Sequence, residues 1–250
     1  MARQLNAGAA LGACGGLRRA PGGSRAVDGC DGSPRQVPLG PTMGLMRLYL
    51  SSFRTGQHPE RLLGMAGGGL RTALVPNALD GLDAQVRAAG LGRDLRDLHA
   101  VGLDATILDL RQSGSVEQLA DYDIVWVRGG NVFVLRRVLA DTGADDRLVE
   151  LLRRDAMVYG GYSAGACVLA PDLLGLEEVD DVTAVLEPLM SGLALLDRPF
   201  VPHVRSPNHP ETAACDTVSA TYAAAGQSHW ALRDGEVLLI DGEKVELLPA

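Results

Sequence analysis

The chain is poor in aromatic residues and in lysine. Phe, Tyr and Trp together make up 4% of its 250 residues, whereas 46% of the residues are hydrophobic, so an aliphatic core large enough for one substantial domain is expected. Lysine occurs once, as Lys244, and arginine carries nearly all of the positive charge. The formal net charge of -8 argues against general binding to nucleic acid or to an anionic membrane surface.

Cysteines and long apolar runs are also scarce. The four cysteines are widely spaced and form no CxxC pair, so the sequence gives no support to a zinc or redox site and is typical of a protein of the reducing cytoplasm. No apolar run approaches the length of a membrane span. The N-terminus lacks the continuous hydrophobic stretch of a secretory signal. We therefore expect a cytoplasmic protein with no nucleic-acid partner, no membrane partner and no metal.

The first 45 residues differ in composition from the rest. They are rich in Gly, Ala, Arg and Pro and show neither helical nor strand periodicity, which predicts a disordered extension. A start codon assigned too far upstream is the alternative, because Met43 and Met46 stand just before the first strand-like run. The folded domain is expected to span residues 46–250.

Within that domain, strand-like and helix-like segments alternate, which predicts an α/β fold with a mostly parallel sheet sandwiched between helices. The last two strand-like runs flank Asp241-Gly242, a strong signal for a C-terminal β-hairpin. Ligands of parallel sheets bind where the strands end, at their carboxyl edge. Strands are expected at 46–50, 72–76, 105–110, 123–127, 156–159, 236–240 and 244–248, and helices at 82–98 (broken near Gly90 and Gly92), 132–139, 145–154 and 208–225.

One of these strands leads into the pattern of a nucleophile elbow, Gly161-Tyr-Ser-Ala-Gly165. Glycines two positions before and after Ser163 remove the Cβ atoms that would clash in a sharp strand-to-helix turn. Such a turn projects the serine Oγ outward and places it at the positive end of the following helix. An ordinary glycine-rich turn is the alternative for the pentapeptide alone.

A serine nucleophile needs a general base, usually an imidazole oriented by a carboxylate. His203 is the best candidate, because it follows an extended run that Pro199 and Pro202 stiffen and that would end at the carboxyl edge. His99 is expected to pack on a helix and His209 to lie near a helix start. The carboxylate is expected in the acidic loop between Ser163 and His203, which contains Glu178, Asp180 and Asp181.

The oxyanion of an acyl-transfer reaction needs two N–H donors. One is expected from Ala164, directly after the serine. The other is expected from the Gly129-Gly130 turn after the strand at 123–127, where glycine lets the backbone approach closely.

The succession of Val127-Arg-Gly-Gly-Asn131, Gly161-Tyr-Ser-Ala-Gly-Ala166 and Pro202-His203 resembles the peptidase E family over residues 46–250. The resemblance implies serine peptidases of the aspartyl dipeptidase type with a class I glutamine amidotransferase-like fold. By position it implies that Ser163 is the nucleophile and His203 the base, and that Gly130 and Ala164 are the oxyanion donors. It places the acid at Glu178, where the family has aspartate, and the substrate-binding residues at Gly129 and Asn131.

The resemblance further implies hydrolysis of short peptides, Asp-X dipeptides among them, through an acyl-enzyme and without a cofactor. Two other functions stay open at this point. An α/β-hydrolase esterase shares the elbow but would need an HGGG-type oxyanion loop, which the sequence lacks. A non-catalytic relative would keep the fold and use the pocket for binding. The oligomeric state is open, a homodimer included.

Overall fold

The computed structural model describes residues 45–250 and a two-residue strand, β1 (Arg35–Gln36). Of the predicted extension, residues 1–45, all but Arg35, Gln36 and Leu45 lie outside the described residues. β1 pairs antiparallel with β10 (Lys244–Leu248), so two residues of a segment expected to lack structure form a strand.

Eight strands form one sheet, in the order β1-β10-β9-β2-β6-β5-β3-β4. The five strands from β2 to β4 in this order are mutually parallel, as the alternation of segments predicted. The C-terminal hairpin of β9 and β10 continues the sheet by pairing β9 antiparallel with β2. The parallel strands and the first hairpin strand are β2 (Arg47–Ser51), β3 (Arg71–Val75), β4 (Asp104–Ile107), β5 (Ile124–Val127), β6 (Val158–Tyr162) and β9 (Val237–Asp241).

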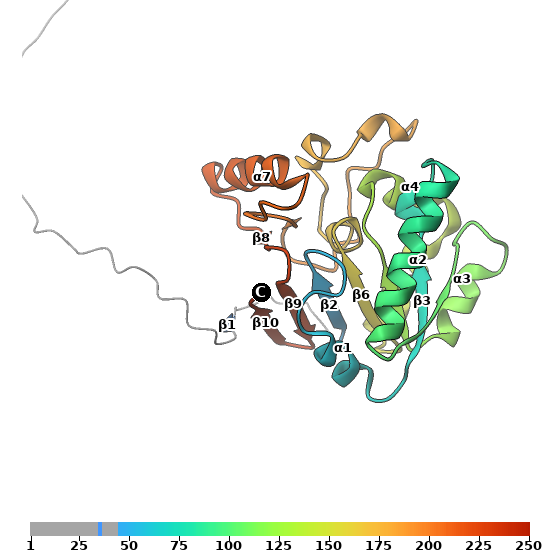
Figure 1. Cartoon of the computed structure of the whole chain (residues 1–250). Helices are drawn as coiled ribbons and strands as arrows, with labels where there is room; N and C mark the ends of the chain where they lie inside the picture. Colours follow the sequence, from blue (N-terminus) through green and yellow to red (C-terminus); the bar gives the residue numbers. More distant parts are fainter. Residues whose placement is uncertain (1–34, 37–44) are drawn as a thin grey trace, which may run out of the picture. The chain divides into compact units, whose positions relative to one another are not determined.

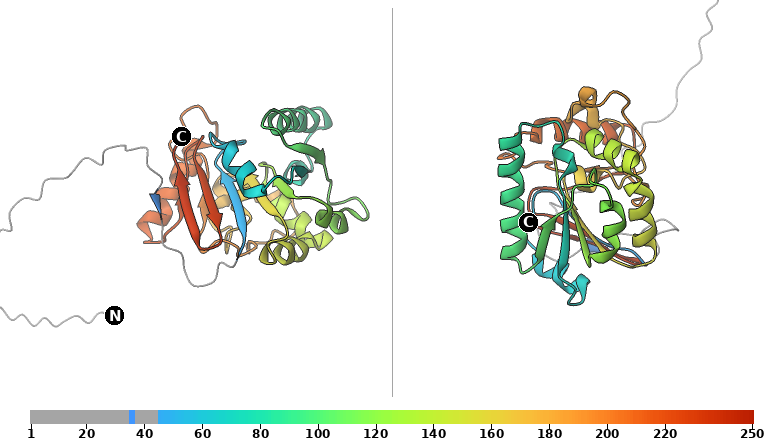
Figure 2. Two further views of the ribbon diagram at one scale, coloured as in Figure 1. Left: turned by 90° about the horizontal axis from the view of Figure 1, so that it is seen from below. Right: turned by 90° about the vertical axis from the view of Figure 1, so that its right-hand side faces the viewer.

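Helices cover both faces of this sheet (Figures 1 and 2). Alternate residues of the strands point to opposite faces, and the buried apolar side chains accordingly fall into two clusters. One cluster packs the sheet against α4 (Val132–Thr142) and α5 (Ala144–Arg153). The other packs it against α1 (Pro59–Ala66) and α2 (Ala84–Ala100).

A third, smaller cluster lies beside the sheet, where α7 packs over a pair of short parallel strands. This part of the chain contains His203 and the segment that follows it. Its elements are β7 (Phe200–Val201), α7 (Thr212–Ala224) and β8 (Trp230–Ala231). Two short helices complete the list of α-helices in the described residues, α3 (Ser115–Gln118) and α6 (Ala164–Cys167).

Some segments differ from the prediction. β4 ends at Ile107 rather than at residue 110, because Asn77 and the Asp109 carboxylate hold the next turn: the Leu110 N–H donates to Asn77 Oδ1. Helix α2 runs unbroken through Gly90, which lies against the Arg128 guanidinium. Helix α1 was not predicted, and the triple glycine that follows it ends this helix, with Gly67 at a φ of 61°.

Two further expectations concern the chain as a whole. None of the helices within the described residues combines the length and the hydrophobicity that crossing a membrane requires. Cys167 and Cys215 are buried free thiols.

Candidate active site

Ser163 lies in a sharp turn between β6 and α6, as the elbow pattern predicted. Its backbone has a φ of 50° and a ψ of −121°, a conformation that L-residues rarely adopt and that costs on the order of 1–3 kcal/mol. The turn is held from behind by the neighbouring strand, since a Cβ at Gly161 or Gly165 would meet the carbonyl oxygen of Val127. The two glycines of the pentapeptide are therefore required by contact with β5. The strained serine is partly buried at the sheet edge.

The Gly129-Gly130 turn lies directly beside this serine. β5 and β6 are adjacent and parallel, with Val127 opposite Gly161, so the turns that follow them meet at the same edge. A Cβ at Gly129 would lie 2.8 Å from the Cβ of Ser163. Gly130 has a φ of 146°, and a side chain there would collide with the backbone of Ala78. Both glycines are thus needed for the close approach.

The predicted oxyanion donors lie in these two turns. In the part of the chain that the structure describes, the backbone N–H groups of Gly130 and Ala164 donate to no backbone acceptor in turns or loops. Ala164 is the first residue of α6, where an N–H has no partner within the helix. Two N–H groups flank the serine and remain able to bind a developing negative charge.

His203 is held in an uncommon backbone conformation just after β7. Its φ is 58°, and its side chain is only 1% exposed. The backbone N–H of His203 donates to the hydroxyl of Ser52 at 2.8 Å. Ser52 directly follows β2, the strand that pairs with β6 and places Ser51 opposite Tyr162. The histidine is therefore anchored to the same carboxyl edge as Ser163.

Two contacts connect the serine turn with the histidine. The Cys167 thiol, at the end of α6, donates to the carbonyl oxygen of Phe200 in β7 at 3.3 Å. The ring of Phe53 packs edge-on against Tyr162, with centroids 6.2 Å apart, and against His203, with centroids 5.9 Å apart. The two predicted catalytic residues are thus brought to one region although they are forty positions apart in the sequence.

The carboxylate on the histidine is that of Asp234. Its Oδ1 lies 2.7 Å from His203 Nδ1 and accepts a second hydrogen bond from the Ser52 hydroxyl at 2.9 Å. Burial alone would raise the pKa of Asp234, but the bonds from His203 and Ser52 outweigh it and hold the pKa below its ordinary value. An ionised Asp234 fixes the proton of the neutral imidazole on Nδ1 and leaves a lone pair on Nε2.

The acidic loop named by the sequence lies elsewhere. Glu178 is exposed at the end of a 3-10 helix (Leu176–Glu178), and the ion pairs of His203 within the described residues are with Asp234 and Glu211. Asp180 accepts a hydrogen bond at 2.8 Å from the backbone N–H of Val132 at the start of α4. Burial, opposed by that bond, raises the pKa of Asp180 to about 7. Asp181 caps the next turn by accepting from Thr183.

Asn131, the predicted substrate-binding residue, acts as the cap of α4. Its Oδ1 accepts from the N–H groups of Phe133 and Val134, and its Nδ2 donates to the carbonyl oxygen of Asp181. The side chain therefore joins the glycine turn to the acidic loop. Gly129 is the member of the predicted substrate pair that directly borders the serine.

The sequence did not single out Asp234, because the acidic residues that the sequence indicated, Glu178, Asp180 and Asp181, all lie between the serine and the histidine. Asp234 instead follows His203 by 31 positions, in the turn between β8 and β9. The available signal was the turn dipeptide Asp234-Gly235, directly before a predicted strand whose start lies at the same edge of the sheet.

A buried ion pair between Asp94 and Arg128 lies next to the residues that precede the two turns of the site. Asp94 in α2 lies 2.6 Å from Nε of Arg128, and the two side chains are 2% and 7% exposed. The Tyr162 hydroxyl lies between them, accepting from Arg128 at 2.9 Å and donating to Asp94 at 3.2 Å. Arg128 and Tyr162 directly precede Gly129 and Ser163, so this cluster joins the two turns of the site.

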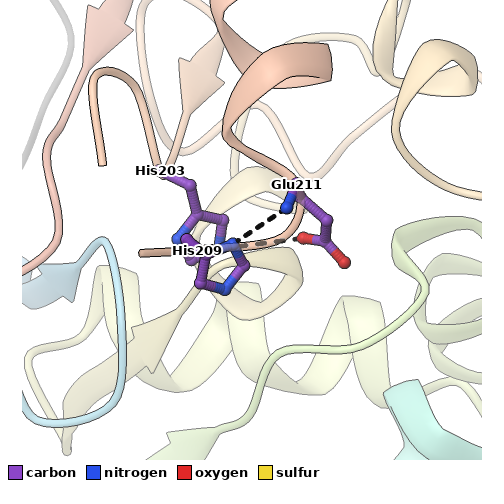
Figure 3. A group of neighbouring side chains, drawn as sticks. All are labelled: His203, His209 and Glu211. Carbon is purple, nitrogen blue, oxygen red and sulfur yellow. Dashed lines mark hydrogen bonds and ion pairs between the residues drawn. The ribbon is translucent and has the colours of Figure 1, made fainter. Parts of the chain in front are cut away.

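Two further polar side chains lie beside the His203 imidazole (Figure 3). The ring of His209 stacks on that of His203, with centroids 3.5 Å apart and an interplanar angle of 4°. Burial, helped by the neighbouring His203, lowers the pKa of His209. Glu211 Oε2 lies 4.0 Å from His203 Nε2, on the side of the imidazole away from Asp234.

A protein-family model matches most of the chain. The model describes peptidase family S51, and it matches residues 54–248, which include both glycine turns, Ser163, His203 and Asp234. The chain belongs to peptidase family S51. It is accordingly a peptidase, and its membership favours amide hydrolysis over the esterase that the elbow alone left open.

The names of similar proteins agree with the S51 assignment. The chain is 29% identical over 197 residues to peptidase E of Streptomyces coelicolor, with 75% of each chain covered. It is 29% identical over 152 residues to an uncharacterised peptidase of Listeria monocytogenes, covering 59% of this chain and 72% of the relative. A probable alpha-aspartyl dipeptidase of Drosophila melanogaster is 28% identical over 136 residues, covering 53% of this chain and 55% of the relative.

Solved structures show the same fold as this S51 chain. A proposed peptidase E protein from Listeria monocytogenes EGD-e superposes with a TM-score of 0.66 at 23% identity, covering 82% of this chain and 98% of the other. A peptidase from an acI-B1 actinobacterium superposes with a TM-score of 0.63 at 14% identity, covering 83% and 90%. At these identities the likeness concerns the fold, and it agrees with the predicted mostly parallel sheet between helices.

Proposed function

We propose that this member of family S51 is a serine peptidase with Ser163 as nucleophile, His203 as general base and Asp234 as the acid that orients the base. The observation that carries the proposal is the pairing of two features at one sheet edge: a strained serine beside two unbonded N–H groups, and an imidazole whose Nδ1 is held by a carboxylate. This combination supports acyl transfer more directly than it supports binding alone.

The reaction follows from the atoms at hand. His203 Nε2 removes the proton of Ser163 as Oγ attacks the carbonyl carbon of the peptide bond. The negative charge that develops on the carbonyl oxygen is stabilised by the N–H groups of Gly130 and Ala164. The imidazolium, stabilised by ionised Asp234, then gives its proton to the leaving amine, and a covalent acyl-enzyme remains.

Hydrolysis of the acyl-enzyme repeats the same steps with water. His203 Nε2 removes a proton from the water molecule, the hydroxide attacks the ester carbonyl, and the proton returns to Ser163 Oγ. Gly161 and Gly165 lie against the Val127 carbonyl, so we expect the serine turn to keep its conformation in both half-reactions. The same two N–H groups therefore serve both half-reactions.

Short peptides are the proposed substrate class, and Asp-X dipeptides are the first to test, because relatives of the chain carry the names peptidase E and alpha-aspartyl dipeptidase. The test is a panel of X-Leu dipeptides in which X is Asp, Asn, Glu or Ala, with short-chain esters alongside. Faster cleavage of Asp-Leu than of Asn-Leu would support charge recognition. Equal rates across the panel would contradict it while leaving the peptidase proposal intact.

The serine mechanism itself is tested by covalent labelling. A fluorophosphonate probe is expected to modify one serine in the full chain, and peptide mapping should locate the label at Ser163. Ser163→Ala should abolish both the labelling and peptide hydrolysis. An unlabelled wild-type protein that hydrolyses no peptide of the panel would favour the non-catalytic binding relative instead.

A further inference from the structure

A second group of polar side chains lies near Nε2 of His203, the ring nitrogen that does not bind Asp234. One ligand atom from each of His203, His209 and Glu211 lies within 4.8 Å of the other two, and Figure 3 shows the three side chains converging. Two imidazoles and one carboxylate make up the protein ligands of a common type of zinc site. All three residues come from the segment between β7 and α7, so a single loop provides the whole set.

His203 is prepared for coordination by its other contact. Because Nδ1 is held by Asp234 at 2.7 Å, the lone pair of the neutral ring is on Nε2, the atom that lies 4.0 Å from Glu211 Oε2. A carboxylate that holds the remote nitrogen of a ligating histidine is the usual outer partner in zinc sites, where it fixes the ring and raises its basicity.

The other two side chains are able to close on an ion. Ligand atoms around tetrahedral zinc, at about 2.0–2.1 Å from the metal, lie roughly 3.4 Å from one another. The carboxylate of Glu211 is 43% exposed and lies directly before α7, so a small rotation closes the 4.0 Å separation. His209 is half buried, stacks on His203 and accepts a hydrogen bond at Nδ1 from the Glu211 backbone N–H at 3.3 Å. Binding an ion through Nδ1 would replace that bond and tilt the ring out of the stack.

We propose that His203, His209 and Glu211 form an inhibitory site for a divalent transition-metal ion of the zinc type. The proposal rests on the proposed function, because the ion would occupy the Nε2 lone pair that removes the proton of Ser163. An ion bound there stops formation of the acyl-enzyme without contacting the substrate carbonyl. The reaction itself uses no metal, so removal of the ion restores the free base.

Metal binding is tested directly, without reference to activity. Co²⁺ alone is titrated into the full chain after treatment with a chelator, and its visible absorption bands are followed, since their intensity reports low coordination number. The expected result is saturation at one ion per chain in the wild-type protein and in Ser163→Ala. His209→Phe, which keeps an aromatic ring on the stack, and Glu211→Gln should each weaken binding at least tenfold.

His229→Asn is the matched control. His229 is bonded to Ser219 and lies outside the cluster, so its replacement should leave the cobalt titration unchanged. Absence of saturable binding, or full binding in His209→Phe, would overturn the proposed site even if the peptidase is active. Saturable binding at this site, together with a Ser163 that stays unlabelled in the chelator-treated, metal-free protein, would instead show that the proposed function is the part that fails.

Inhibition is tested with Zn²⁺ on each variant, compared with its own rate in the presence of a chelator. Zn²⁺ should inhibit the wild-type protein and should block fluorophosphonate labelling of Ser163 over the same concentration range. In His209→Phe and Glu211→Gln the inhibitory concentration should rise at least tenfold. Activation by Zn²⁺, or inhibition that is equal in all variants, would overturn the proposal.

Discussion

Gly129 and Ser163 are so close that a methyl group on Gly129 would lie 2.8 Å from the serine Cβ. The contact arises because β5 and β6 are adjacent parallel strands and each ends in a glycine-containing turn. The serine elbow and the turn that carries the proposed second oxyanion donor therefore lie so close together that no side chain fits at Gly129 without displacing the serine turn.

Gly129→Ala is expected to reduce kcat/KM by at least ~10²-fold, because the added methyl group must displace the serine turn and with it the reacting oxygen. The variant should remain folded by circular dichroism. Gly64→Ala is the control: Gly64 lies in the interior of α1 with no atom within 4 Å of an added Cβ, and the change should stabilise the protein by up to about 1 kcal/mol without affecting activity. Wild-type activity in Gly129→Ala would contradict the role given to the contact.

Asp234→Asn should lower kcat by on the order of 10³–10⁴-fold, since an amide on Nδ1 no longer stabilises the imidazolium and can favour the wrong tautomer. Glu178→Gln removes the acid that the sequence indicated and should change kcat less than about twofold, because its side chain is exposed. Steady-state kinetics of the two variants on one peptide decide between the acids. A large loss in Glu178→Gln alone would return the role to the acidic loop.

Asp94→Ala should destabilise the fold by about 3–5 kcal/mol in urea denaturation, because it leaves the Arg128 guanidinium buried without its partner. Asp97→Ala, three residues further along α2, removes an ion pair with Arg54 in which the two side chains are 21% and 39% exposed. That loss should stay below about 1 kcal/mol. Similar losses of unfolding free energy in both variants would show that burial does not determine how much the Asp94–Arg128 pair contributes to stability.

Asp180 predicts a pH dependence of stability. Its pKa is raised from 3.8 to about 7 in the folded protein, so between pH 4 and pH 7 the folded state binds more protons at this site than the unfolded state does. Stability is therefore lost as the pH rises through this range, by roughly 3–4 kcal/mol. Asp180→Asn should remove this decline, whereas Asp104→Asn, on an exposed position of β4, should keep it. Urea denaturation at pH 5 and pH 8 measures the difference, and parallel curves for wild type and Asp180→Asn would refute the assignment.

Features that depend on neighbours along the chain were predictable. Gly161 and Gly165 around Ser163 indicated the elbow, and the apolar run at 123–127 followed by Gly129-Gly130 indicated the second turn. Asp241-Gly242 between two apolar runs gave the hairpin. Helix α1 was not predicted, because the glycines that end it indicate a turn and say nothing about the segment before that turn. β4 ends earlier than predicted because Asn77, from another loop, accepts a hydrogen bond from the backbone of the turn that follows β4.

Contacts between distant segments were not predictable in the same way. Nothing in the spacing of His203 and Asp234 shows that Ser52, at the end of β2, holds both of them. The assignment of the acid to Glu178 relied on the resemblance, which places the family's aspartate at this position, and position along the sequence does not determine which carboxylate reaches an imidazole. The stacking of His209 on His203 likewise depends on how the loop after β7 folds back over Phe53.

The sequence by itself determined the alternation of strands and helices, the strained serine turn and the glycine turn beside it, because steric limits on the backbone and burial of apolar runs act over a few residues. Only the tertiary structure decided which carboxylate orients the histidine and which side chains surround it, because these contacts arise when strand ends far apart in the chain meet at one edge of the sheet.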